Sequence, residues 1–258
     1  MNRIKKPTPF LFVKEFINLP FRKKLIFIFG HPIEMINENE FIDLLIEGYS
    51  LFRWADGETA LARGKSISYQ EANPDLSAKL ISLVSNEGGK IIAGISWVYR
   101  VSLFSRLWDT RLLKILLSTK LILTKYFSNI NRNRKIVETL IWYDLYEDLP
   151  KILSRICEDK FAILITAEKR YLEICPNNTK IILAPKKDAF SSYTEICESL
   201  NILIKSEIGN FVVISTIGPT SKALVADFHE VCQIIDVGHG FSFYFGGYGN
   251  FAWREKVN

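Results

Sequence analysis

The chain has few of the residues that build metal-cysteine and disulfide scaffolds. Its 258 residues include only four cysteines, which are widely spaced and form no C-x-x-C pair: Cys157, Cys175, Cys197 and Cys232. This spacing excludes a zinc ribbon and a disulfide framework, and we expect ordinary buried thiols. With 48% hydrophobic and 24% charged residues, the chain can still bury a sizeable core, which excludes disordered and low-complexity classes.

Long apolar runs are also missing. The longest stretch without a charged residue, 237–253, has 17 residues and five glycines, whereas a helix needs about 20 apolar residues to cross a bilayer. The N-terminus shows no apolar run followed by a small-residue cleavage site, so nothing resembles a secretory signal. We therefore expect a cytoplasmic protein without a transmembrane helix.

The net charge of +5 is concentrated in two segments. Residues 1–30 hold seven Lys or Arg against one Glu, and residues 100–135 hold nine against one Asp, so the remainder is acidic on balance. Both segments interleave basic residues with Phe or Leu, which suits peripheral contact with an anionic membrane. An extension packed on the domain and a core-facing helix over 103–127 are the alternative explanations. Nucleic acid is not an expected partner, because exposed stacking aromatics do not accompany these charges.

Short runs rich in β-branched residues alternate with helical periods. This pattern predicts an α/β fold, a Rossmann-like open sheet with helices on both faces. The predicted strands are 50–54, 90–95, 161–165, 180–183, 210–215 and 233–236. The predicted helices are 38–47, 58–63, 75–85, 135–145, 149–158, 192–206 and 221–227. We expect a basic apolar N-terminal extension, 1–35, followed by a single domain, 36–258, with a basic helical insertion around 100–135.

The first predicted strand is followed by two carboxylates. Asp56 and Glu58 lie two residues apart in a turn, and Arg53 precedes them. Open α/β sheets bind ligands at the carboxyl ends of their strands. Paired carboxylates suit Mg²⁺ or Mn²⁺, Arg53 can hold a phosphate, and Gly57 lets the backbone pass close to a ligand. A surface turn with acids favoured at a helix N-terminus remains the simpler alternative.

Two further strand exits carry polar groups. After the strand 210–215, a helix opens with hydroxyls and an ammonium that suit a phosphate cradle, although the spacing is not that of a Walker A loop. The residues of this phosphate cradle, which we predict to bind substrate, are Gly218, Pro219, Thr220, Ser221 and Lys222. A capped helix start would explain the same residues. After the strand 233–236, Asp236 and His239 lie three residues apart, and either can act as a base or bond the local backbone.

In this order, the three exits resemble the GT-D-type glycosyltransferases, a bacterial family once called a domain of unknown function. The family pattern is roughly R-F-G-D-G-E, a Gln after a short strand, P-x-x-N-A-F-x-x-Y, G-P-T-A and D-I-G-H. It is met over about residues 40–245, at Arg53, Asp56–Glu58, Gln70, Pro185, Ala189–Phe190, Tyr193, Gly218–Thr220 and Asp236–His239.

The resemblance implies a function and its cofactor. It implies a nucleotide-sugar donor, expected to be a UDP-sugar, and a divalent cation, Mn²⁺ or Mg²⁺, at Asp56 and Glu58. It also implies substrate-binding roles for Gln70, Pro185 and Tyr193. A metal at the two carboxylates would neutralise the donor diphosphate, and Asp236 and His239 are the candidate bases. The expected acceptor is a glycan or a lipid-linked sugar of bacterial surface polysaccharide or glycoprotein biosynthesis, met at the inner face of the membrane.

Two departures from the family pattern keep other functions open. Family members usually continue D-I-G-H with further acids, whereas this chain has Phe241 and Phe243. The family's Gly- and Asn-rich stretch after the middle strand is replaced here by residues 166–170. A binding-only relative would hydrolyse no donor. A nucleotide- or S-adenosylmethionine-dependent transferase would need no divalent metal.

Overall fold

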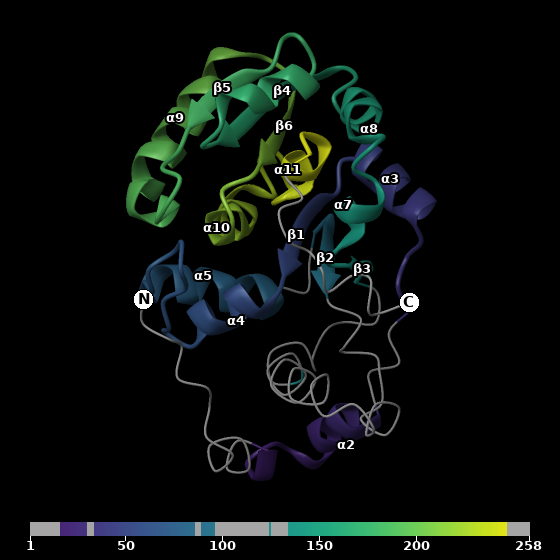
Figure 1. Cartoon of the computed structure of the whole chain (residues 1–258), viewed down its shortest axis with the longest axis vertical. Helices are drawn as coiled ribbons and strands as arrows, with labels where there is room; N and C mark the ends of the chain where they lie inside the picture. The colour runs from purple at the N-terminus through teal and green to yellow at the C-terminus, as the bar shows by residue number, and fades with distance from the viewer. Residues whose placement is uncertain (1–15, 30–33, 86–88, 96–123, 125–133, 247–258) are drawn as a thin grey trace.

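The structure, a computed structural model, describes residues 16–29, 34–85, 89–95, 124 and 134–246. Within these residues, seven strands form one sheet in the order β3-β2-β1-β7-β6-β4-β5, with every neighbouring pair parallel (Figure 1). The strands are β1 (Ser50–Trp54), β2 (Ile91–Ile95), β3 (Ile136–Glu138), β4 (Lys160–Thr166), β5 (Lys180–Leu183), β6 (Asn210–Ser215) and β7 (Gln233–Asp236). The predicted Rossmann-like α/β fold is confirmed.

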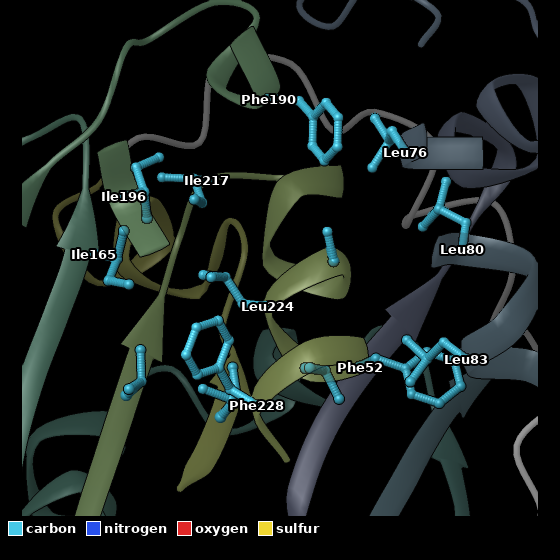
Figure 2. Packing of buried hydrophobic residues seen from close by; sticks show 14 of the residues in the cluster. Phe52, Leu76, Leu80, Leu83, Ile165, Phe190, Ile196, Ile217, Leu224 and Phe228 are labelled. Carbon is cyan, nitrogen blue, oxygen red and sulfur yellow. The ribbon is translucent and has the colours of Figure 1, made fainter. Parts of the chain in front are cut away.

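Helices cover both faces of the sheet, because its strands are apolar on both sides. Phe52 and Trp54 of β1 pack into one core, and Leu51 between them packs into the other. The first core takes residues of α4 (Asp56–Ala62), α5 (Pro74–Ser85), α9 (Tyr193–Ser206) and α10 (Pro219–Phe228). Figure 2 shows Leu83 of α5 beside Phe52 in this core, and Leu76, farther along α5, beside Phe190.

The second core lies on the opposite face. It takes residues of α3 (Glu38–Ile46), α7 (Ile141–Asp144), α8 (Leu149–Ile156), the 3₁₀ helix η3 (Lys169–Ile174) and α11 (Gly240–Tyr244). Helix α3 begins after Asn37, whose side chain accepts a hydrogen bond of 2.9 Å from the backbone N–H of Glu40. A second 3₁₀ helix, η4 (Ala189–Ser192), lies directly before α9.

One predicted helix is wrong in its first part. Over 135–145 the sequence predicts a helix, but the chain forms the strand β3 and only a short helix, α7. Ile136 pairs with Ala93 at the edge of the sheet, and both Ile136 and Val137 are buried. Three residues are too few to show a strand period, so the apolar spacing of the whole segment favoured a helix.

The two basic segments lie largely outside the described residues. Of the N-terminal extension, the structure describes 16–29, 34 and 35, including α2 (Phe21–Phe29). Of the predicted insertion, only Thr124, Arg134 and Lys135 are described. No helix within the described ranges is long and apolar enough to cross a membrane.

The parallel arrangement decides where the candidate ligand-binding residues gather. The carboxyl ends of all strands lie at one edge of the sheet, and Ser215 at the end of β6 pairs with Asp236 at the end of β7. β7 in turn pairs with β1, through Leu51 and Ile235. The three strand exits identified in the sequence are therefore neighbours in space.

Candidate active site

A cavity of about 910 Å³ opens at the carboxyl edge of the sheet. It is lined by residues that follow β1, β3, β4, β5, β6 and β7. The predicted site residues that line it are Arg53, Asp56, Glu58, Gln70, Pro185, Gly218, Lys222 and His239. Gly57, Tyr193, Pro219, Thr220, Ser221 and Asp236 do not line it.

A buried charge cluster forms the floor of this region. The ammonium of Lys222 lies 2.8 Å from Asp236 Oδ2 and 3.0 Å from Glu58 Oε1, and it donates to the carbonyl of Gly218 at 3.2 Å. Lys222 is only 3% exposed and Asp236 is fully buried. Burial alone would lower the pKa of Lys222, but Asp236 and Glu58 outweigh it and raise the pKa above its usual value. Lys222 of α10 is therefore charged, and its ion pairs with Glu58 and Asp236 link α10 to α4 and β7.

Arg53 is the second cation of this cluster. Its backbone N–H donates to Asp236 Oδ2 at 3.2 Å, its Nε lies 3.5 Å from the same oxygen, and its Nη1 donates to the carbonyl of Thr139 at 3.2 Å. The guanidinium lies directly against Gly238, which has a φ of +55°. A Cβ at Gly238 would stand 1.5 Å from Arg53 Nη2, so only glycine fits here. Gly238 falls within the segment that matches D-I-G-H but was not predicted as a site residue, and Thr139 was not predicted at all.

Asp56 and Glu58 occupy the first turn of α4 but have different surroundings. Glu58 is 5% exposed, and its Oε2 accepts a hydrogen bond of 3.0 Å from the backbone N–H of Ala55, which caps the helix. Asp56 is exposed, and its Oδ1 accepts from the N–H of Gly57 at 2.9 Å. Asp56 is thus the more accessible carboxylate of the pair.

The donor set is compatible with a divalent cation that also takes ligands from substrate. Among the described residues, no three His, Cys, Asp or Glu side chains converge as a preformed metal site. Mg²⁺ commonly binds one or two carboxylates and completes its shell with water and substrate phosphate. Asp56 suits this role, and the Glu58 oxygens keep further lone pairs beside their bonds to Ala55 and Lys222.

The hydroxyls of the predicted phosphate cradle bond within the protein. Ser221 Oγ lies 2.8 Å from Ser215 Oγ, and Thr220 Oγ1 donates to Gln70 Oε1 at 3.3 Å. Pro219 is the buried first residue of α10 and follows Gly218, whose φ is +61°. With Lys222 engaged as well, this segment offers a ligand mainly its backbone at Gly218, which lines the cavity.

Gln70 is a buried link between segments that are far apart in the sequence. Its Nε2 donates to Asp188 Oδ1, and its Oε1 accepts from Thr220 and from the backbone N–H of Phe190 at 3.4 Å. Tyr193 has a comparable structural position, because its hydroxyl donates to Asp227 at 2.9 Å and its ring stacks on Phe190. Gln70 thus forms part of the cavity wall, whereas Tyr193 and these two partners lie outside the cavity lining.

His239 lines the cavity at the N-cap of α11. Partial burial lowers the pKa of its imidazole, and the positive charges of Arg53 and Lys222 lower it further. The ring is therefore neutral at pH 7 and able to accept a proton. Asp236, the other candidate base, is fully buried and ion-paired with both cations.

Tyr69 also lines the cavity, although no role was predicted for it. It is 44% exposed, its hydroxyl lies near the Gly57 turn, and its ring lies beside Gly218. Burial raises its pKa, and the negative charge of Glu58 raises it further. The hydroxyl is therefore a neutral hydrogen-bond donor beside the two carboxylates of α4.

Phe241 and Phe243, which replace acids usual in the family pattern, are buried in the core rather than placed in the cavity. Between them, Ser242 lines the cavity and bonds Tyr171 Oη at 2.8 Å. Tyr171 and Arg170 complete this wall. Neither of these two residues was predicted, because nothing in their local sequence marks them as ligand-binding.

Known proteins share this fold and parts of this sequence. A domain of unknown function 1792, described as having a distinct glycosyltransferase fold, superimposes with a TM-score of 0.64 at 22% identity, covering 88% of this chain and 83% of that one. A second structure, described as a new glycosyltransferase from Streptococcus sanguinis, gives a TM-score of 0.61 at 24% identity, covering 83% and 84%.

A curated sequence is also similar. The "Probable glycosyl transferase Gly" of Streptococcus gordonii is 25% identical over an alignment of 227 residues, which covers 80% of this chain and 32% of that protein. The present chain thus spans about a third of that relative. Residues 51–245 match the family described as "Glycosyltransferase GT-D fold". Since this match covers more than half of the chain and every strand exit of the cavity, the protein belongs to the GT-D glycosyltransferase family.

Proposed function

We propose that this protein transfers a sugar from a nucleotide-sugar, a UDP-sugar, to a hydroxyl of a glycan or lipid-linked acceptor. The observation that carries the proposal is the cavity of about 910 Å³, which brings Asp56, Gly218 and His239 together in a chain of the GT-D family. Pathways that build bacterial surface polysaccharides or glycoproteins require such a transfer.

His239 is the proposed base. The acceptor oxygen attacks the anomeric carbon, the bond from that carbon to the diphosphate breaks, and the electron pair leaves with the nucleoside diphosphate. The hydroxyl proton passes to the imidazole, which is neutral because burial and nearby cations lower its pKa. Asp236 acts indirectly, since it holds Arg53 and Lys222 in place.

Asp56, with Glu58 beside it, would hold Mn²⁺ or Mg²⁺. Such an ion, when bound, neutralises charge on the donor diphosphate as a Lewis acid. Gly218, which precedes α10, and the Tyr69 hydroxyl, which lies near the Gly57 turn, line the same cavity and would donate hydrogen bonds to the diphosphate.

The acceptor side of the proposal includes peripheral contact with the inner face of the membrane. Ile17, Phe21 and Leu25 recur every fourth residue and are 61%, 76% and 40% exposed, in the segment where basic residues outnumber acids seven to one. Exposed apolar side chains beside Lys and Arg bind anionic lipid surfaces. Equal sedimentation with neutral and anionic vesicles would contradict a charge-dependent contact.

A screen of nucleotide-sugars for hydrolysis and transfer, with Mn²⁺ or with a chelator, tests the function. Release of a nucleoside diphosphate from one donor supports the proposal. Binding without turnover would indicate a binding-only relative, and turnover unaffected by chelation would favour a metal-independent transferase.

A further inference from the structure

The anionic diphosphate of the proposed donor needs cationic partners in the cavity. Among the described residues, four Lys or Arg side chains line it: Arg53, Arg170, Lys186 and Lys222. Three of them are already paired with carboxylates. Lys222 pairs with Glu58 and Asp236, Arg53 pairs with Asp236, and Lys186 lies 2.9 Å from Glu168.

Arg170 differs from the other three cations. It forms no ion pair with any carboxylate in the part of the chain that the structure describes. Its side chain is solvent-exposed and contributes to the cavity wall. A guanidinium keeps its charge at every physiological pH and presents its donors as a planar fork that matches phosphate oxygens.

Two aromatic rings hold Arg170 in place. Its Cζ lies 5.6 Å from the centroid of the Tyr171 ring and 5.4 Å from that of Phe245. The Tyr171 ring is in turn fixed by the hydrogen bond to Ser242 and by an edge contact with Phe241 at 5.1 Å. A cation–π contact attracts the charge of the guanidinium without supplying an oxygen acceptor, so the N–H groups can still donate to a ligand.

The contact between Arg170 and Phe245 joins the two segments in which this chain departs from its family pattern. Arg170 ends the stretch 166–170 that replaces the Gly- and Asn-rich segment, and Phe245 belongs to the aromatic stretch that replaces the acids after His239. The two departures therefore form one structural unit, whose polar end is the Arg170 guanidinium.

We propose that Arg170 binds the diphosphate of the nucleotide-sugar donor and stabilises the negative charge on the departing nucleoside diphosphate. This inference rests on the proposed glycosyltransferase function and adds a residue to its donor site. Arg53 and Lys222, the cations that the sequence suggested for this task, keep the cavity floor together instead.

Binding of UDP and of inorganic diphosphate, measured by calorimetry in the presence of a chelator, tests the assignment without depending on turnover. Arg170→Gln should weaken both by about 10- to 100-fold, as expected for loss of a charge-assisted pair of hydrogen bonds. Uridine, which has no phosphate, should bind both proteins equally. Arg170→Lys should retain part of the affinity, because it keeps the charge and loses the fork.

The matched control is Lys169→Gln, which removes an exposed charge from the neighbouring position outside the cavity lining. It should leave diphosphate binding unchanged. In transfer assays, Arg170→Gln should raise the KM for donor and lower kcat, with the KM for acceptor unchanged.

Three outcomes would overturn the inference while leaving the proposed function intact. They are equal diphosphate affinity in Arg170→Gln and the parent, equal weakening by Lys169→Gln, and a change confined to the KM for acceptor, which would place the bound phosphate on the acceptor. Absence of turnover with every nucleotide-sugar, together with tight diphosphate binding that Arg170→Gln weakens, would instead refute the function and keep the site.

Discussion

Replacing Lys222 with Met should destabilise the fold severely, although a polar residue is exchanged for an apolar one. The ammonium lies 2.8 Å and 3.0 Å from two carboxylates, and all three side chains are less than one tenth exposed. Loss of one partner from a buried pair leaves an uncompensated charge and costs about 3–5 kcal/mol. A domain of this size loses roughly 2–4 °C of Tm per kcal/mol, so Tm should fall by roughly 6–20 °C.

The measurement is thermal and urea unfolding followed by circular dichroism. Lys151 provides the matched control, since it also lies 2.9 Å from a carboxylate, Asp148, but is 83% exposed. Lys151→Met should leave Tm unchanged, because exposed pairs contribute little. Adding Glu58→Gln to Lys222→Met should recover part of the loss. Equal Tm values for Lys222→Met and Lys151→Met would refute the view that burial makes this pair important.

The ion pairs of Lys222 with Glu58 and Asp236 also predict how the stability of the fold depends on pH. The pKa of Lys222 is raised in the folded state above its ordinary value of 10.5. Its contribution is therefore fully present below about pH 10.5 and is lost as pH rises through the folded pKa. The urea midpoint of the parent protein should fall in this alkaline range. The decrease of the urea midpoint that comes from deprotonation of Lys222 should be absent in Lys222→Met. An identical alkaline profile in both proteins would contradict the raised pKa of Lys222.

Three further predictions concern the cavity. His239→Ala should lower kcat by about 10²- to 10⁴-fold and remove an acid limb of kcat/KM that lies below pH 6.5, since the pKa of this imidazole is lowered from that value; retention of the limb would exclude His239 as the base. Asp56→Asn should abolish stimulation by Mn²⁺ with little change in Tm, because the carboxylate is exposed; unchanged stimulation would remove Asp56 from the metal site. Gly238→Ala should lower both Tm and activity, since its Cβ would overlap Arg53 Nη2, and a stable, active variant would contradict the packing described.

The sheet was largely predictable because its strands are continuous buried runs. β1, β5, β6 and β7 have the predicted bounds, since β-branched and aromatic residues fill them and turns delimit them. β3 was missed because its three residues become a strand only through pairing with β2. No local pattern reports a pairing partner that is more than 40 residues away.

The sequence by itself determined six of the seven described strands, that they form an α/β sheet, and that polar residues follow β1, β6 and β7. Only the tertiary structure decided what those polar residues do. It turned Lys222 and Arg53 inward onto Glu58 and Asp236, and left Arg170 unpaired with carboxylates among the described residues. Strand propensity and burial depend on nearby side chains, whereas the task of a charged group depends on which opposite charges the fold brings within a few ångströms.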